Sequence, residues 1–421
     1  METFDSLVLE EDEQPKGRNN EYLLVFLLAF ICYLASVDAM LLMPLINEVM
    51  AAFKVGTKSA TTVVSIYSFF AFLSGILSSG WVDRFDRKKA LLFCFAGFTI
   101  GTTLCAFATN FYAMIGCRAI TGVFGGIVGG VATAMVSDII PYERRATAIS
   151  IISLSFAVAA ITGIPFAFHL VIKYDLFMPF KILAAVSGLT LLAVHVWLPN
   201  MTDHIHLIDK SVKRLAYIVD VFKDKNQVLA LFLAFIIIFS HQVVILFIIP
   251  YFENNIGFDE DWVPIMYAIG GICTVITSPF IGKFSDKIGN KQSFLILMLL
   301  SFIPIYITTN ITSASIPVAI VICATFFILA AGRIIPAYTI MTAATTKDKR
   351  GGFMSLRSAF LELGTAVASV VSGFVVGINA TGKVTNFNKL GYISIACGLL
   401  AIVISRFCKS SYYRLKALNQ H

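Results

Sequence analysis

The sequence predicts an all-α polytopic membrane protein in which twelve transmembrane helices form two pseudo-symmetric six-helix bundles. Three observations support this fold class. The 421 residues are 58% hydrophobic and 14% charged, with a mean hydropathy of +0.84, which leaves too little charge to cover a water-exposed surface. Twelve apolar runs each approach or exceed the roughly 20 residues that cross a bilayer. A charged loop motif also recurs about half a chain length later.

The apolar runs between charge clusters define the expected helices in order. The first six cover residues 22–46, 61–82, 90–109, 111–137, 146–171 and 178–198. The second six cover residues 228–251, 261–282, 292–310, 316–343, 353–377 and 389–407. We therefore expect one bundle over residues 22–198 and another over 228–407, joined by a cytoplasmic central loop, 199–227. An acidic tail, 1–21, and a second tail, 408–421, flank them.

Lysine and arginine are concentrated in alternate loops, which indicates an orientation in the membrane. If the N-terminus is inside, the cytoplasmic loops and tails hold 23 of the 32 basic residues and the outer loops hold five. Basic loops are retained on the cytoplasmic side. We therefore expect both termini in the cytoplasm, and we attribute the net charge of +7 to orientation and anionic lipid rather than to nucleic acid.

A charged loop motif occurs at matching places in the two halves. Residues 79–89 read SGWVDRFDRKK and residues 282–291 read GKFSDKIGNK, and their aspartates, Asp83 and Asp286, are 203 positions apart. Duplication of a six-helix unit explains the repeat economically. An acidic residue among so many bases indicates a partner, either a basic side chain or the positive end of a helix. A solvated turn that only fixes topology is the alternative.

This motif is similar to the signature loop of the major facilitator superfamily, Gly-x-x-x-Asp-Arg-x-Gly-Arg-Lys. The loop, the repeat and the twelve spans together cover nearly the whole chain. The first copy departs from the pattern at Ser79 and Asp86, and the second at Lys287 and Asn290. The resemblance implies the major facilitator fold and a loop that helps to lock the outward-facing state. It assigns this gate role to Asp83, Arg84, Arg87, Lys88, Asp286 and Lys287.

Charged collars follow spans four and ten. The first contains Asp138, Glu143 and Arg144 and resembles the inner gate of the same family. Arg350 lies at the matching place after span ten. We expect these residues to form a gate rather than to bind substrate.

Glycine spacing predicts where helices approach one another or bend. Gly122, Gly126 and Gly130 lie at i, i+4 and i+8 in span four, which predicts a bare face against which another helix packs. Gly163 and Pro165 predict a bend in span five. This Gly-x-Pro sequence is similar to that of the arabinose-efflux-like and drug/proton antiporter branch of the family, and the similarity implies export.

Ionisable residues inside the spans are the candidates for proton coupling. Asp38 lies about 12 Å from the outer end of span one, where its carboxyl would carry protons. Permanent pairing with Arg118 is the rival interpretation. Arg118 lies seven residues inside span four, where a charge needs a cavity or a partner unless it snorkels to the surface. It resembles the Arg-x-x-x-Gly element that the family associates with proton transfer.

Further polar residues lie within the second half. Glu362 is expected to pair with Arg333 or Arg357, and His241 lies 203 residues after Asp38, at a pseudo-equivalent position across a central cavity. A simple interhelical hydrogen bond is the alternative for His241. The candidate lining of the substrate cavity is Tyr67, Gln242, Arg333 and Arg357.

These features predict a secondary active transporter that exports a drug, sugar or metabolite by proton-coupled alternating access. The sequence contains no Walker loop, nucleotide-binding domain, metal cluster or nucleophile triad, so we expect a proton gradient as the energy source, no cofactor, and no enzymatic activity. A proton symporter or facilitator that imports a nutrient is the alternative, and a membrane sensor or scaffold a remote one. The expected partners are the lipid bilayer, protons and a small-molecule substrate. We expect a monomer in a bacterial inner membrane.

Overall fold

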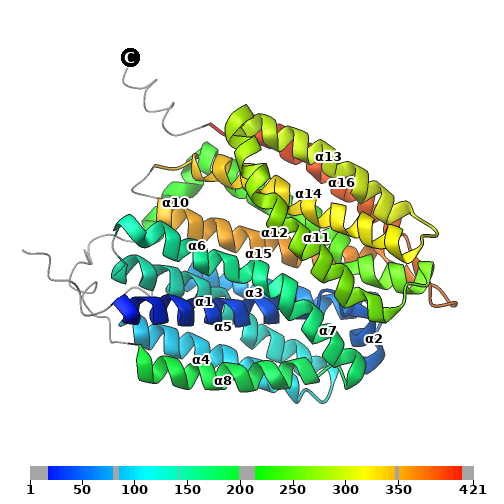
Figure 1. The fold of residues 1–421 in the computed structure, drawn as a ribbon, viewed down its shortest axis with the longest axis horizontal. Coiled ribbons are helices and arrows are strands. Elements are labelled where there is room, and N and C mark those ends of the chain that lie inside the picture. Colours follow the sequence, from blue (N-terminus) through cyan, green and yellow to red (C-terminus); the bar gives the residue numbers. More distant parts are fainter. Residues whose placement is uncertain (1–17, 79–84, 141, 199–213, 347–349, 410–421) are drawn as a thin grey trace, which may run out of the picture.

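The computed structural model describes residues 18–78, 85–140, 142–198, 214–346 and 350–409. In this part of the chain, twelve helices are long and apolar enough to cross a membrane, and each coincides with one of the predicted spans. The predicted all-α polytopic fold class is therefore confirmed. We call the side where α1 (Arg18–Leu41) begins and α16 (Phe387–Phe407) ends the terminal face, and the opposite side the distal face. The terminal face is on the left in Figure 1.

The first half contains six membrane-spanning units, the fifth of which is divided by a π-helical segment, and it occupies the lower part of Figure 1. Its elements are α1 (Arg18–Leu41), α2 (Ile46–Phe53), α3 (Thr57–Ser78), α4 (Arg87–Ala106), α5 (Phe111–Ile139), α6 (Tyr142–Val158), η2 (Ala159–Gly163), α7 (Ile164–Lys173) and α8 (Met178–Trp197).

The second half occupies the upper part of Figure 1, and helix α10 precedes it on the terminal face. Two short antiparallel strands, β1 and β2, form a hairpin on the distal face between α15 and α16. The elements are α10 (Arg214–Lys223), α11 (Lys225–Tyr251), η3 (Phe252–Ile256), η4 (Glu260–Trp262), α12 (Val263–Ile288), α13 (Asn290–Asn310), α14 (Ile316–Thr342), α15 (Arg350–Val375), β1 (Gly377–Ile378), β2 (Val384–Thr385) and α16 (Phe387–Phe407).

The first membrane helix ends earlier than predicted. Helix α1 stops at Leu41, and the chain turns before Pro44 and enters α2, which buries Ile46 and Val49. Proline lacks an amide donor and disfavours helical backbone in the residue before it, so the apolar run does not continue as one helix. Asp38 consequently lies within the last turn of α1, closer to the distal end than predicted.

The two halves meet along α3 and α15. At the distal end, the Thr57 hydroxyl donates to the backbone carbonyl of Val376 at 2.9 Å. Towards the terminal face, the rings of Phe72 and Phe360 pack edge to face with centroids 6.1 Å apart. The second contact between the halves places η2 and α7 against α12. The described residues of α5 and α6 make no comparably extensive contact with the second half.

Glycines permit close contact between α3 and α5. A Cβ atom at Gly122 would clash with the Tyr67 carbonyl oxygen, and one at Gly126 would lie 2.6 Å from the Ala71 carbonyl oxygen. Gly130 is exposed and has nothing within 4 Å of such an atom, so the predicted close face does not extend to it. Each four-residue step rotates an α-helix by about 40°, which turns Gly130 about 80° away from Gly122.

The interruption of span five is π-helical. The segment Ala159–Gly163 leads into α7, and Pro165 lies in the first turn of that helix. A Cβ atom at Gly163 would clash with the Val37 side chain of α1, so this glycine lets span five approach the helix that carries Asp38. The predicted break at Gly163 and Pro165 therefore takes the form of a change in helix type.

The second copy of the repeated motif is more helical than a loop. Helix α12 continues through Asp286 and Lys287 to Ile288. The chain then reverses at Gly289, whose φ of +87° lies in the region that glycine tolerates without a steric penalty.

Candidate functional site

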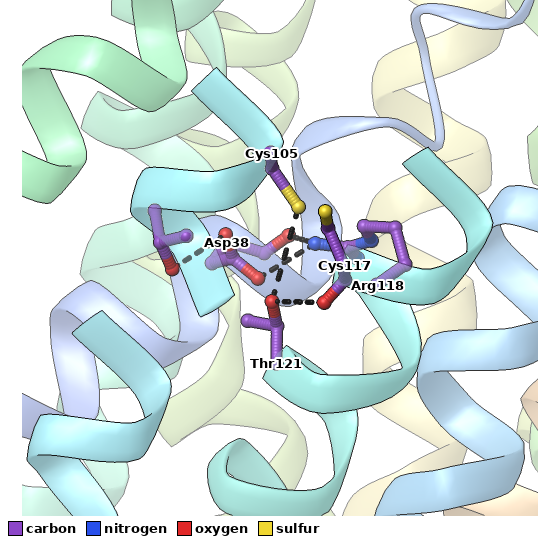
Figure 2. A network of polar contacts seen from close by, with 6 residues as sticks. Asp38, Cys105, Cys117, Arg118 and Thr121 are labelled. Atoms are coloured by element: carbon purple, nitrogen blue, oxygen red, sulfur yellow. Dashed lines mark hydrogen bonds and ion pairs between the residues drawn. The ribbon is translucent and has the colours of Figure 1, made fainter. Parts of the chain in front are cut away.

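A buried ion pair joins α1 to α5. The Nη1 atom of Arg118 donates to Oδ2 of Asp38 at 2.7 Å and to the Asp38 backbone carbonyl at 3.3 Å (Figure 2). Both side chains are completely buried. Arg118 therefore does not snorkel to the surface, and in this conformation Asp38 is paired. Each side chain offsets the free-energy cost of burying the charge of the other, which would be high for either charge alone.

Helix α4 supplies a second contact to the acid. The Thr102 hydroxyl donates to Oδ1 of Asp38 at 3.4 Å, so both carboxylate oxygens have a partner. Sequence reasoning missed Thr102, because one threonine in an apolar helix gives no functional signal. The adjacent Gly101 lets α4 approach α5 closely, since a Cβ atom there would lie 2.7 Å from Oγ1 of Thr121.

A small polar network lies close to the ion pair on α4 and α5. The Thr121 hydroxyl donates to the Cys117 carbonyl at 2.8 Å and lies 3.9 Å from Sγ of Cys105 (Figure 2). Cys105 is therefore more than a small apolar residue, because its sulfur contributes to the polar surroundings of the pair.

Tyr67 of α3 covers the guanidinium. The centre of the Arg118 guanidinium lies 4.3 Å from the centroid of the Tyr67 ring, a cation–π geometry. Tyr67 is itself buried, so in this conformation it forms part of the ion-pair site and does not line an open cavity.

Glu362 of α15 faces the first half of the protein. Its carboxyl interacts with the Ser68 side chain of α3 and lies within electrostatic range of the neighbouring Tyr67. No described ion pair joins Glu362 to Arg333 or Arg357, in contrast to the predicted pairing. The rotation of α15 directs Glu362 towards α3, on which Ser68 and Tyr67 lie.

The candidate arginines of the second half have other contacts. Nη1 of Arg333 lies 3.2 Å from the Ser301 hydroxyl and 3.3 Å from the Met298 sulfur, both on α13. The Arg357 guanidinium lies 4.6 Å from the centroid of the Tyr338 ring on α14. These two arginines therefore point to different neighbours and do not converge on one described cavity.

His241 and Gln242 of α11 point in different directions. The His241 ring stacks on Phe326 of α14 with centroids 5.4 Å apart, and its Nδ1 atom has no hydrogen-bond partner. The Gln242 amide lies 3.7 Å from the Met43 sulfur and so contacts the first half. Only Gln242 of this pair lies at the interface between the halves.

Among the described residues, two ion pairs lie at the terminal face of the first half. Nε of Arg87 donates to Oδ2 of Asp138 at 2.9 Å, which joins the start of α4 to the end of α5. Arg144 of α6 lies 3.0 Å from the Glu21 carboxylate of α1. The motif and the collar that follows span four are thus brought together by the Arg87 to Asp138 contact.

The remaining candidate gate residues are less informative. Asp83 and Arg84 lie outside the described residues, and the side chains of Glu143 and Arg350 are likewise not described. The backbone amide of Lys88 donates to the Asp86 carboxylate, which caps α4. The side chains of Asp286 and Lys287 are exposed at the end of α12.

A polar contact that sequence reasoning missed closes the distal face between the halves. Nδ2 of Asn47 on α2 donates to Oε2 of Glu253 at 2.6 Å, and Nδ2 of Asn254 donates to Oδ1 of Asn47 at 3.3 Å. These side chains also line a depression of about 710 Å³ on this face. No motif marks Asn47 in the sequence, because its partners are about 206 residues away.

Glu48 lies beside this contact, outside the membrane-spanning helices. Burial raises its pKa from 4.5 to about 7, and the negative charge of Glu260 acts in the same direction. A hydrogen bond from the backbone partly opposes the increase. The distal contact therefore contains a carboxyl that titrates near neutral pH.

Twelve spanning helices, two halves in contact along α3 and α15, and an ion pair buried within the first half define a polytopic membrane transporter. Comparison with known proteins identifies the family. The chain belongs to the Major Facilitator Superfamily, whose family model matches residues 25–273 and 230–411. It is thus an integral multi-pass membrane protein of a family of transporters, not of enzymes.

Several relatives are similar over most of the chain. Multidrug resistance protein 2 of Bacillus subtilis is 22% identical over 374 residues, which are 86% of this chain and 91% of that protein. Multidrug resistance protein MdtG of Salmonella schwarzengrund is 24% identical over 383 residues, 85% of this chain and 92% of that one.

Solved structures share the fold at low identity. A bacterial homologue of the human lysosomal transporter Spinster, in an inward-facing and occupied conformation, has a TM-score of 0.73 and 14% identity, covering 93% of this chain and 97% of its own. A D-xylose-proton symporter has a TM-score of 0.72 and 14% identity, covering 91% and 97%.

Proposed function

We propose that this transporter exports a small organic molecule in exchange for protons, with Asp38 as the proton carrier. The observation that carries the proposal is the fully buried pair of Asp38 and Arg118 near the distal end of α1. A carboxyl at this depth gains or loses its charge only together with a change in its partner. The multidrug resistance relatives favour export as the direction.

The proposed cycle alternates between two arrangements of the halves. In the arrangement described, Asn47 and Glu253 join the halves at the distal face. The excess of basic residues in alternate loops favours a cytoplasmic terminal face, in which case this state would open inward. Protonation of Asp38 removes its charge, weakens its attraction for Arg118 and permits the two helices to separate. Movement of one bundle against the other then opens the distal face.

The energy source, cofactor requirement, oligomeric state and location belong to the same proposal. The energy source is the proton gradient, and no cofactor takes part. The proposed unit is a monomer in a bacterial inner membrane, with both termini in the cytoplasm.

The test uses everted membrane vesicles with an imposed pH gradient, acidic inside. Wild-type vesicles should accumulate a fluorescent organic molecule from a panel that includes ethidium and fluorescein, and addition of the molecule should raise the pH of the lumen. Asp38→Asn should abolish both signals. Asp175→Asn is the matched control, since Asp175 is an exposed distal residue 3.4 Å from Lys181. Undiminished pH-driven accumulation by Asp38→Asn would refute the proposal, and acidification of the lumen would indicate symport.

A further inference from the structure

Two arginines are among the largest fully buried side chains of the protein, and they differ in one respect. Arg118 and Arg333 are both completely buried, on α5 and α14, the fourth spans of their respective halves. Arg118 has the Asp38 carboxylate at 2.7 Å. Among the described residues, no carboxylate forms an ion pair with Arg333. The second half therefore contains a buried positive charge that its described side chains do not balance.

The contacts of Arg333 leave most of its donors unused. Nη1 meets the Ser301 hydroxyl and the Met298 sulfur, whereas Nε and Nη2 have no hydrogen-bond partner. The guanidinium cannot lose its charge under ordinary conditions. An unbalanced buried charge is strongly disfavoured, so the fold is most stable when a negative group approaches these free donors.

His241 provides a second unused nitrogen near this arginine. Its ring stacks on Phe326, which lies seven residues before Arg333 and therefore on almost the same side of α14. Its Nδ1 atom has no partner, and the residue lies within electrostatic range of Arg333. Unlike Arg333, the His241 side chain is partly exposed.

A comparison of the two halves indicates that, among the described residues, Arg333 lacks the carboxylate partner that Arg118 has. Asp38 lies on the first span of its half and supplies the negative charge for Arg118. His241, 203 residues later on the first span of the second half, cannot supply one. Ser301 occupies the third span of its half, as Thr102 does in the first. The second half thus has the arginine and the hydroxyl but lacks the acid.

We propose that Arg333, with Ser301 and His241, forms an anion-binding site within the second bundle that takes one compact anionic group, a carboxylate or a halide. The free Nε and Nη2 atoms offer the forked geometry that binds a carboxylate or a small anion well. The anion comes either from solution or from a transported molecule that carries it. This site is independent of the direction of transport and of the role of Asp38.

The test measures the thermal unfolding midpoint of the purified full-length protein in detergent, at constant ionic strength and pH. Chloride, acetate or benzoate replaces a bulky sulfonate buffer anion. A ligand that binds the folded state raises the midpoint saturably. The wild type should respond to chloride or to the carboxylates, and Arg333→Gln should weaken the apparent affinity about ten-fold or more. Arg357→Gln removes a partly buried arginine that packs on Tyr338 and has no described contact with this site, so it should respond as the wild type does.

Further variants keep the test decisive if Arg333→Gln does not fold. Ser301→Ala retains the charge but removes the hydroxyl that holds Nη1, and should weaken anion binding several-fold with a normal fold. A response to chloride alone identifies an ion from solution, and a response to carboxylates alone identifies a carboxylate-bearing substrate; either supports the site. No response of the wild type to any of these anions would overturn it. So would an equal response in Ser301→Ala, or loss of the response in Arg357→Gln. The assay needs no gradient, so its failure is distinct from failure of proton coupling.

Discussion

Arg118 and Asp38 form an ion pair of 2.7 Å in which neither side chain is accessible to solvent. The pair joins α5 to α1, and Thr102 on α4 binds the second carboxylate oxygen. The carboxylate of Asp38 therefore links three spans of the first half, α1, α4 and α5. A change in the protonation of Asp38 acts on all three helices at once.

The two members of this pair should be strongly coupled in stability. Asp38→Asn or Arg118→Gln alone leaves a polar or charged partner buried without compensation, and removal of one partner of a buried pair costs about 3–5 kcal/mol. The double variant removes both charges and should cost less than the sum of the single variants. Unfolding of the four proteins in detergent measures the coupling free energy. Additive losses would show that the pair contributes nothing as a unit.

The contact between α3 and α5 should distinguish two glycines of the same helix. Gly122→Ala introduces a methyl group against the Tyr67 backbone, so it should lower the unfolding midpoint and the transport rate. Gly130→Ala meets nothing within 4 Å, and its higher helix propensity favours the variant by up to about 1 kcal/mol. Thermal unfolding of both variants tests this difference. An equal loss in Gly130→Ala would contradict the described packing of α5.

The terminal-face ion pair of Arg87 and Asp138 should affect transport more than folding. Asp138 is 30% exposed at its side chain, so loss of the pair by Asp138→Asn should cost at most about 1 kcal/mol. The transport rate should fall several-fold, because the contact fixes the start of α4 against the end of α5. The exchange variant Arg87→Asp with Asp138→Arg should recover part of the rate. Asp175→Asn, at the exposed distal position 3.4 Å from Lys181, is the control, and an equal loss of transport there would argue against a specific gate.

Closure of the distal face should depend on pH through Glu48. Its pKa is raised from 4.5 to about 7 in the closed arrangement, so the closed state binds the proton more tightly than a state that exposes Glu48. The stabilisation of closure is thus complete below about pH 4.5 and is lost as pH rises towards 7. The carboxylate of Glu260 adds repulsion once Glu48 ionises, and Glu253 is a further titratable group at this contact. Asn47 at the same contact does not titrate.

Spin labels at Thr109 and Lys389, exposed distal positions in different halves, can measure this effect in a cysteine-free background. Their separation should increase between pH 5 and pH 8, and Glu48→Gln should reduce the increase. Distances that depend on pH equally in both proteins would assign the effect to another group.

The number and order of the spans could be predicted because a bilayer requires long apolar helices, and every such run is visible in the sequence. The end of span one could not be predicted from hydropathy, since Pro44 interrupts a run that is still apolar. The cost of two buried charges made pairing of Asp38 with Arg118 one of two alternatives, and the sequence did not decide between them. The partner of Glu362 was missed, because it depends on how α15 rotates against α3, and no local pattern records that rotation.

The same limit applies to Gly130 and to Asn47. A regular glycine spacing drifts around the helix axis, so the third member of the series leaves the contact that the first two make. Asn47 binds Glu253, which lies in the other half of the chain. A single asparagine after an apolar run does not indicate such a distant partner.

The π-helical segment of span five has a mechanical consequence. A π-turn holds about one residue more than an α-turn, so the helix beyond it is out of phase with the helix before it. Removal of that extra residue from the turn would swivel α7 by about 100° and shift it by about 1.5 Å while α6 kept its place. Since η2 and α7, rather than α6, pack on α12, such a rotation would change which side chains of the first bundle contact the second bundle. The side chains that span five presents to α12 therefore depend on the π-helical turn Ala159–Gly163.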